Sequence, residues 1–392
     1  MKSSQFRLTR SRRSNRSKSQ GRPGLEIWQW LSSMGVLTVL CLLVTIMVWR
    51  RTDVLVNFSL RASERTIEWP LLHIVHTRFQ QDQPHLLFLG KARLLLFKTF
   101  CLPTMISQTS QQFLWIIHTD PKLHHELRAE LRAMLHPYPH FYLIGSNVNM
   151  NLDSESTWRD NTQGKIILQS PIHSGDVTLL RQAYVMRHSR PLLETRLDAD
   201  DGLHSEYLEY LQTSATKSFA TSQSWMYWCS RRHLEWFPGD NLQPVEHSKL
   251  CISAGITVGY NIGTSIVPHF PHDVLYKSLV PGQCGVDKCI DLVNDFPFCA
   301  IRSRTLTSAG MKDLSPSRKW PKTQLWNLVH DKFHIQSTSD VQVYMQNHLV
   351  EIAKDNLAGQ CTLGHSCKLQ AKEDLQRLIE LKETLLNGVV DP

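Results

Sequence analysis

The chain has 392 residues, of which 42% are hydrophobic and 9% aromatic, and its formal net charge is +8 at pH 7. This apolar content is enough for a packed core, so a largely disordered protein is excluded. The positive charge is concentrated in the first stretch, MKSSQFRLTRSRRSNRSKSQGR, which carries eight Lys and Arg and no acidic residue. Because the rest of the chain is neutral, its composition gives no reason to expect a nucleic-acid partner.

An uncharged apolar segment follows the basic start. Residues 27–49, IWQWLSSMGVLTVLCLLVTIMVW, have tryptophan near both ends. A helix of about 20 apolar residues spans a bilayer, and an excess of basic residues before it places that side in the cytosol. A cleaved signal peptide is the alternative, but its apolar region is usually shorter. We expect a cytosolic tail over 1–26, a transmembrane signal anchor over 27–49, a stem over 50–69 and a lumenal domain over 70–392.

The cysteines favour an oxidising compartment for the part of the chain after the apolar segment. Eight of the nine cysteines follow that segment, which is an even number. The pairs Cys284/Cys289 and Cys361/Cys367 are each spaced to close a short loop. We therefore expect several disulfide bonds in a single-pass type II protein of the secretory pathway, although spacing does not give their full connectivity.

After residue 70, apolar strand-like runs alternate with helical segments. Strands are predicted over 71–77, 113–120 and 140–145, and helices over 93–108 with a break at Pro103, over 121–135 and over 175–190. This alternation predicts an α/β, Rossmann-like fold with a mainly parallel sheet and helices on both faces. Residues 224–238 and 254–265 alternate apolar and polar residues as antiparallel strands do, and 371–388 form an amphipathic helix.

Three aspartates are crowded together where the apolar run LLETRLDADDGL, residues 192–203, comes to an end. On an extended backbone Asp198 and Asp200 point the same way, and two such carboxylates repel each other unless a cation lies between them. Mg²⁺ or Mn²⁺ held by one or two carboxylates takes its other ligands from water and substrate phosphates. The cluster predicts a metal and diphosphate site with Asp198, Asp200 and Asp201 as candidate ligands. The alternative is a solvated turn in which Asp201 begins the next helix.

Polar residues follow three of the predicted strands. Thr77 and Arg78 end the first, Asp120 ends the second, and the aspartate cluster ends a later one. Ligands of open α/β sheets bind beyond the carboxyl ends of the strands. We therefore expect these residues to converge on one binding pocket.

The segment TRLDADDGL, preceded by the helical LLRQAYVMRHSR, resembles the DXD region of glycosyltransferases with the GT-A fold. HTRFQ, ARLLLFKTFCLPTMISQTSQQFLWIIHTD and RSRTLTSAGM extend the resemblance to the rhamnosyltransferase family, over about residues 71–311. The resemblance implies a glycosyltransferase that moves a hexosyl group, such as rhamnosyl, from a nucleotide-sugar donor to a glycan or glycoconjugate acceptor with Mn²⁺ or Mg²⁺. The anchor also resembles that of Golgi glycosyltransferases, which implies a Golgi membrane protein with a lumenal catalytic domain.

The resemblance also implies roles for particular residues and regions. Thr77, Arg78 and Asp120 match nucleoside contacts, Arg181 matches an arginine near the nucleotide, and Asp198 and Asp200 match the metal and diphosphate positions. The nucleotide-sugar half covers about 70–215 and the acceptor half about 216–392.

The group that takes the acceptor proton is not identified by any motif. Candidates are Asp287, Asp291 and Asp295 in CGVDKCIDLVNDFPFC and Asp313 farther on, each of which is also an ordinary residue for a polar loop. Two other functions stay open at this point. One is a metal-dependent phosphoester hydrolase that uses the same carboxylates, and the other is a non-catalytic lumenal carbohydrate-binding protein on a transferase scaffold.

Overall fold

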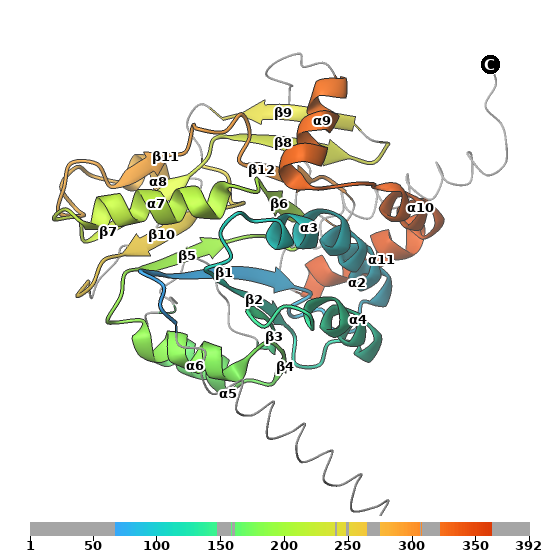
Figure 1. The fold of residues 1–392 in the computed structure, drawn as a ribbon. Coiled ribbons are helices and arrows are strands. Elements are labelled where there is room, and N and C mark those ends of the chain that lie inside the picture. Colours follow the sequence, from blue (N-terminus) through green and yellow to red (C-terminus); the bar gives the residue numbers. More distant parts are fainter. Residues whose placement is uncertain are drawn as a thin grey trace, which may run out of the picture. The chain divides into compact units, whose positions relative to one another are not determined.

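The computed structural model describes residues 67–146, 158, 161–239, 241–247, 251–264, 275–305, 307 and 322–362. The chain divides into two compact units, Met1–Arg65 and Thr66–Pro392. The first unit, which contains the predicted tail and anchor, lies outside the described residues. The second unit contains every element drawn in colour in Figure 1.

An eight-stranded sheet forms the centre of the second unit, in the order β11-β7-β10-β5-β1-β2-β3-β4 (Figure 1). Its strands are β1 (Leu72–Phe79), β2 (Leu114–Thr119), β3 (Phe141–Gly145), β4 (Ile172–Ser174), β5 (Leu192–Arg196), β7 (Trp225–Cys229), β10 (Thr257–Tyr260) and β11 (Ile290–Leu292). Strands β5, β1, β2 and β3 run parallel, whereas β10 is antiparallel to β5 and β7, and β4 to β3. Strand β11 is parallel to β7, so four of the seven strand pairs in this mixed sheet are parallel and three are antiparallel. Antiparallel neighbours such as β10, which need no helical crossover, were not part of the prediction of a mainly parallel sheet.

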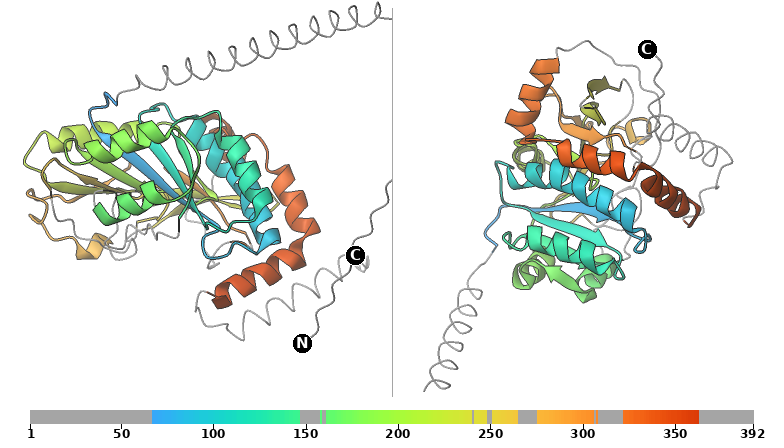
Figure 2. Two further views of the ribbon diagram at one scale, coloured as in Figure 1. Left: turned by 90° about the horizontal axis from the view of Figure 1, so that it is seen from below. Right: turned by 90° about the vertical axis from the view of Figure 1, so that its right-hand side faces the viewer.

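Helices cover both faces of this sheet, as Figures 1 and 2 show. One face carries α2 (Leu87–Leu96), η1 (Phe97–Cys101, one turn of π-helix), α3 (Leu102–Ile106), α4 (His125–Leu135) and α7 (Tyr207–Phe219). The other carries α5 (Asn161–Gln169), α6 (Val177–Met186) and α8 (Leu275–Ser278). Successive strand residues alternate between the two cores: Val75 and Trp115 pack in the first, Ile74 and Ile116 in the second.

A second, four-stranded sheet was not expected from the sequence. Its order is β6-β12-β8-β9, with β6 (Asp201–Leu203), β12 (Ala300–Ser303), β8 (Arg232–Phe237) and β9 (Asn241–Glu246). Its apolar face packs in a third core with α2, η1, α9 (Lys322–Phe333), α10 (Ser339–Asn347) and α11 (Leu349–Thr362). The strands of the two sheets are interleaved along the chain: β5 belongs to the first sheet, and the next strand, β6, belongs to the second.

None of the helices in the described part of the chain has the length and apolar composition needed to cross a bilayer. The longest of them, α11, has 14 residues. At 1.5 Å per residue that is about 21 Å, against a hydrocarbon core of about 30 Å. The predictions of a preceding transmembrane helix and of a single-pass type II Golgi membrane protein are therefore corrected. Residues 27–49, from which both were inferred, lie outside the described residues.

Two disulfide bonds are present among the described residues. Cys284 pairs with Cys289, as the spacing predicts, and Cys229 at the end of β7 pairs with Cys251. Cys101 and Cys299 are buried thiols. The predicted Cys361–Cys367 loop lies outside the described side chains, as does the predicted helix over 371–388.

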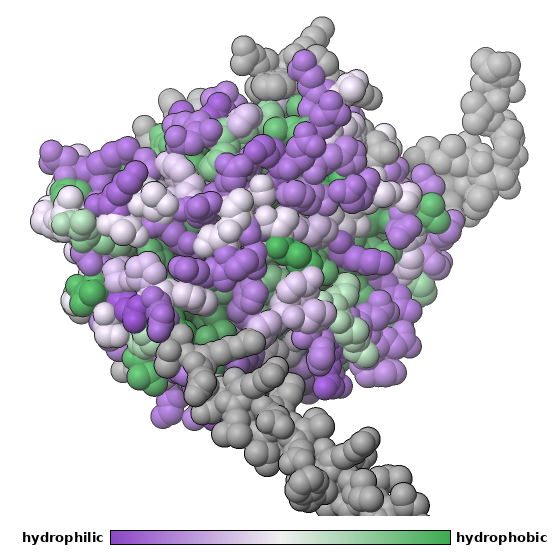
Figure 3. Space-filling view, viewed as in Figure 1, coloured by the Kyte–Doolittle hydropathy of each residue, from purple (hydrophilic) through white to green (hydrophobic). Residues whose placement is uncertain are grey.

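The surface shown in Figure 3 is mainly hydrophilic, and its hydrophobic residues form small separate patches. In the described part of the chain the exposed large hydrophobic side chains are Phe88, Ile166, Val185, Ile262, Val280 and Val343. They lie on different elements. Scattered residues of this kind are normal on a folded protein and do not define an interface.

Candidate functional site

The three predicted aspartates lie where the chain passes from the main sheet to the second sheet. β5 ends at Arg196, and the backbone N–H of Asp201 donates to the carbonyl of Asp198 at 3.1 Å, which closes a four-residue turn. Asp198 and Asp200 are half-buried, whereas Asp201 is only 2% exposed. The turn therefore offers two accessible carboxylates at the carboxyl end of a central parallel strand.

Asp201 belongs to the framework of the site. Its Oδ2 lies 3.2 Å from Nε of Arg302, and the two residues are in register between β6 and β12. Burial raises the pKa of Asp201 well above its usual value, while the Arg302 guanidinium favours the ionised form. The alternative in which Asp201 begins a helix is wrong, because Asp201 begins β6 and α7 starts later, at Tyr207.

Asp198 is surrounded by positive charge. Its Oδ1 lies 3.3 Å from Nη2 of Arg196. Burial opposes ionisation of Asp198, but Arg196, Arg302 and Arg78 together outweigh it, so the pKa of this carboxyl is lowered. Asp198 is therefore an anion at neutral pH with side-chain exposure of 27%, which leaves it open to a further ligand.

Asp200 differs from Asp198 in the direction of its pKa. Burial and the neighbouring Asp198 charge raise the pKa of Asp200, against the opposing effect of Arg93 and Arg302. The hydroxyl of Ser303 donates to its Oδ2 at 3.3 Å. The two accessible carboxylates thus repel each other, and a cation bound between them would relieve that repulsion.

Arg93 on α2 braces the loop that follows β1. Its Nη1 donates to Oε1 of Gln80 and of Gln83, both at 2.8 Å, and its Nη2 donates to the carbonyl of Thr307 at 3.4 Å. Gln80 has a φ of 51°, a left-handed conformation that is uncommon for a residue other than glycine. The side-chain amide of Gln80 donates to the carbonyls of Gln83 and Leu86, which holds this backbone in place.

Gly202 lets the second sheet approach η1 and α3 closely. A Cβ at this position would lie 2.8 Å from the carbonyl oxygen of Phe100 and 2.8 Å from Cγ2 of Thr104. The hydroxyl of Thr104 in turn accepts the backbone N–H of Leu203 at 3.2 Å. A glycine directly after the aspartates is therefore needed to seat β6 against the helices and to fix the turn.

The four segments that carry the family resemblance meet around this turn. HTRFQ supplies Arg78 and Gln80, ARLLLFK supplies Arg93, TRLDADDGL supplies the aspartates, and RSRTLTSAGM supplies Arg302, Ser303 and Thr307. The roles of Arg93, Arg196 and Arg302 were not foreseen. The motifs contain these residues, but the position of an arginine in the sequence does not predict which anionic group it will contact in the fold.

Two of the predicted nucleoside contacts have structural roles. The Thr77 hydroxyl is buried and accepts the indole N–H of Trp115 at 2.8 Å. Asp120 accepts the backbone N–H of Lys122 at 2.7 Å, which holds the turn after β2. Arg78, by contrast, is exposed and close enough to Asp198 to lower its pKa. Of these three residues only Arg78 presents a side chain beside the aspartates.

Arg181 is not brought to the cluster. It lies in the middle of α6 and is exposed. In the part of the chain that the structure describes, no contact links it to Asp198 or Asp200. The arginines that act on Asp198 come instead from β1, β5 and β12.

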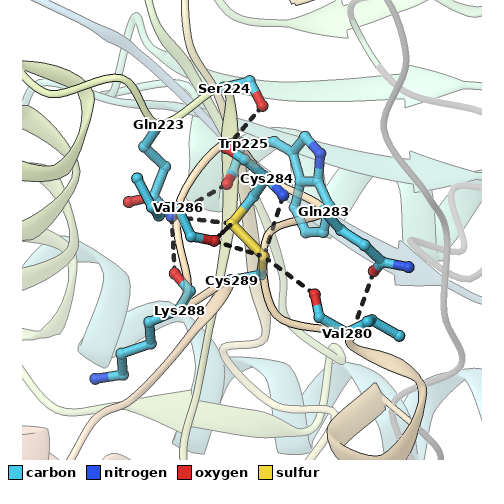
Figure 4. Close-up of a disulfide and its surroundings, with 9 residues drawn as sticks. All are labelled: Gln223, Ser224, Trp225, Val280, Gln283, Cys284, Val286, Lys288 and Cys289. Atoms are coloured by element: carbon cyan, nitrogen blue, oxygen red, sulfur yellow. Dashed lines mark hydrogen bonds between the residues drawn. A yellow bond between two sulfur atoms is a disulfide. The ribbon is translucent and has the colours of Figure 1, made fainter.

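The Cys284–Cys289 disulfide closes a short loop, shown in Figure 4. Asp287 belongs to this loop by its position in the sequence and is exposed. The loop is anchored beside β7, because the backbone N–H of Ser224 donates to the carbonyl of Cys284 at 2.8 Å and the Gln223 amide donates to that of Lys288 at 3.1 Å. These contacts indicate a structural loop.

Asp291 lies on β11, at the edge of the main sheet. The cross-strand register runs from Asp291 through Trp228 and Thr257 to Thr195 of β5, which is three strand spacings or about 14 Å. Its carboxylate accepts the hydroxyl of Tyr210 at 3.2 Å and pairs with Lys288 at 3.1 Å. Asp291 is therefore remote from the aspartate turn. Asp295 is exposed beside Tyr210, and Asp313 lies outside the described residues.

The fit of a divalent cation can be judged from the carboxylates themselves. Within the described ranges, no group of three or more His, Cys, Asp or Glu is placed to hold a metal ion. Asp198 and Asp200 offer two accessible carboxylates, which suits Mg²⁺ or Mn²⁺ when water and phosphate complete the ligand set. Asp201 does not fit as a ligand, since it is buried against Arg302.

A family model described as "Putative rhamnosyl transferase" matches residues 89–156. This match confirms the resemblance to the rhamnosyltransferase family. It also confirms the glycosyltransferase class of enzyme. The matched segment runs from α2 past β3 and includes Arg93 and Asp120, whereas the aspartate turn lies beyond it.

No curated protein matches the chain. Among solved structures, the crystal structure of S. aureus TarS residues 1–349 is similar at 10% sequence identity with a TM-score of 0.29. The alignment covers 81% of this chain and 92% of that one.

Proposed function

We propose that this glycosyltransferase moves a sugar from a nucleotide-sugar donor to a hydroxyl group of a glycan or glycoconjugate acceptor, at the turn that carries Asp198 and Asp200. The observation behind this proposal is the convergence of four segments, distant in sequence, on two accessible carboxylates. Each of those segments supplies an arginine whose charge acts on Asp198 or Asp200. Carboxylates suit a divalent cation and arginines suit phosphate oxygens, so the combination fits a diphosphate.

The proposed cofactor is Mn²⁺ or Mg²⁺ held by Asp198 and Asp200. When bound, such an ion acts as a Lewis acid that neutralises charge on the leaving diphosphate. The raised pKa of Asp200, caused by burial and by Asp198, agrees with a site where an added cation stabilises both carboxylates.

Residues of the chain bind the phosphate groups and hold the parts of the site in position. Arg78, exposed at the end of β1, is placed to contact a phosphate oxygen. Arg302 fixes Asp201 and with it the position of the turn, while Arg93 fixes the loop after β1. The nucleoside would lie against that loop and the turn after Asp120, contacted by main chain near Thr77 because the Thr77 hydroxyl is already bonded to Trp115.

The test is a release assay on the full chain with nucleoside diphosphate sugars, including rhamnosyl donors. We expect release of nucleoside diphosphate to require both a hydroxyl acceptor and Mn²⁺ or Mg²⁺. Release of the same size without any acceptor would indicate a hydrolase. Absence of metal-dependent nucleotide binding would indicate a carbohydrate-binding protein without transferase activity.

A further inference from the structure

The second sheet has a polar face as well as an apolar one. Asp201 of β6, Arg302 of β12 and Glu235 of β8 are in register on three adjacent strands. Residues paired in this way point to the same face of a sheet, so the three form a row of alternating charge that starts at the aspartate turn. With two strand spacings between them, the Cα of Glu235 lies about 10 Å from that of Asp201.

Glu235 is fully buried, and only one of its two oxygens is bonded. Its Oε1 accepts Nε of Arg304 at 2.7 Å and lies 3.1 Å from Nε2 of His233. Its Oε2 is buried and has no hydrogen-bond partner among the described residues. The second ring nitrogen of His233, Nδ1, is in the same situation.

Both unbonded atoms are hydrogen-bond acceptors. Hydrogen bonds from His233 and Arg304 outweigh burial and lower the pKa of Glu235, so Glu235 is an anion. In the tautomer of His233 that donates Nε2–H to this anion, Nδ1 carries a lone pair. Buried acceptors without a donor are destabilising, and such atoms normally have a partner in the protein, in ordered water or in a bound ligand. A ligand that completes this one must supply donors.

The chemistry of the pair selects the kind of ligand. A carboxylate repels phosphates and acids, so the group that binds here is neutral and carries hydroxyl groups. The first neutral, hydroxyl-bearing part of a nucleotide sugar beyond its diphosphate is the sugar ring. Arg302 stands between Asp201 and Glu235 and separates the anionic carboxylate from the diphosphate position.

We propose that Glu235 and His233 accept hydrogen bonds from hydroxyl groups of the donor sugar. This inference rests on the proposed function and assigns the sugar subsite to the polar face of the second sheet, next to the aspartate turn. It gives β8 a role in donor selection, and it explains why two polar side chains two residues apart on one strand are buried with unused acceptors.

The test compares two ligands that differ only in the sugar. Binding of UDP and of dTDP to the full chain is measured by calorimetry with Mn²⁺, each free and as its rhamnosyl conjugate. For the conjugate that binds the parent, we expect Glu235→Gln to lower its affinity about tenfold or more while the affinity for the free nucleotide is unchanged. His233→Gln, which keeps the Glu235–Arg304 pair, should give a smaller loss of the same kind.

Glu246→Gln on β9 is the matched control, because Glu246 is exposed, and it should change neither affinity. The inference is overturned if both β8 variants weaken the binding of free and of conjugated nucleotide equally. It is also overturned if the variants change only the KM for the acceptor. A parent that binds neither ligand with Mn²⁺ overturns the proposed function itself.

Discussion

Arg302 of β12 holds the carboxylate of Asp201 at 3.2 Å, while Asp198 and Asp200 just before it remain partly exposed. The pair lies in register between β6 and β12. This contact separates three neighbouring carboxylates by function. Asp201 fastens the second sheet, and the other two are left to bind a ligand.

Replacing Asp201 tests that separation. Asp201→Asn removes one partner of a buried ion pair, which should lower the free energy of unfolding by about 3 kcal/mol in urea titrations. Metal-dependent nucleotide binding should change by no more than a few-fold. Glu206→Gln, which breaks the half-exposed pair with Lys332, should cost less than about 1 kcal/mol. Normal stability combined with lost binding in Asp201→Asn would mean that Asp201 is itself a ligand.

Two arginines with similar predicted roles have different positions. The charge of Arg78 lowers the pKa of Asp198. Arg181 is exposed on α6 and, among the described residues, makes no contact with the three aspartates. We expect Arg78→Ala to weaken nucleoside diphosphate binding about tenfold, because a charge-assisted contact is lost, and Arg181→Ala to leave it unchanged. The measurement is a calorimetric Kd for both variants. A larger loss for Arg181→Ala would place the nucleotide over α6 instead.

Buried histidines make stability depend on pH. Burial lowers the pKa of His73 and of His76 to about 3, from 6.5 in the unfolded chain. Between about pH 3 and pH 6.5 the unfolded chain binds protons at these histidines that the folded chain does not bind. The part of the free energy of unfolding that depends on these histidines therefore keeps its full value above pH 6.5 and decreases as the pH falls below it. At pH 5 the loss is about 2 kcal/mol for each histidine.

The variant His73→Gln isolates this effect, since the raised pKa values of Asp200 and Asp201 act in the opposite direction in both proteins. Urea titrations at pH 7 and pH 5 should show a smaller loss of stability for His73→Gln than for the parent. His85→Gln, at an exposed position, should behave as the parent does. An equal loss in all three proteins would contradict a neutral buried His73.

The central strands could be predicted because β1, β2 and β3 are short apolar runs buried on both faces. The predicted helix over 93–108 exists, but it starts earlier, at Leu87, and is interrupted by η1 before Pro103. The helix expected from Pro121 starts at His125, because Asp120 first holds a turn. Such differences arise at the ends of helices and strands, where a single hydrogen bond can determine the residue at which the element begins.

The second sheet and the row of alternating charge formed by Asp201, Arg302 and Glu235 could not be predicted. Its strands have three to six residues each, and the pairing of β6 with β12 joins positions about a hundred residues apart. Short strands with mixed polarity have no clear period. The separate role of Asp201 depends on Arg302 and so appears only once that pairing is known.

The most direct test of the account is Mn²⁺-dependent binding of nucleoside diphosphate to the full chain, compared between the parent and the Asp198→Ala/Asp200→Ala double variant. At a free concentration of about 100 times the Kd, bound nucleotide should stabilise the parent by about 2.7 kcal/mol, and the double variant should show no metal-dependent stabilisation. A double variant that binds nucleotide with Mn²⁺ as tightly as the parent would contradict the assignment of the site.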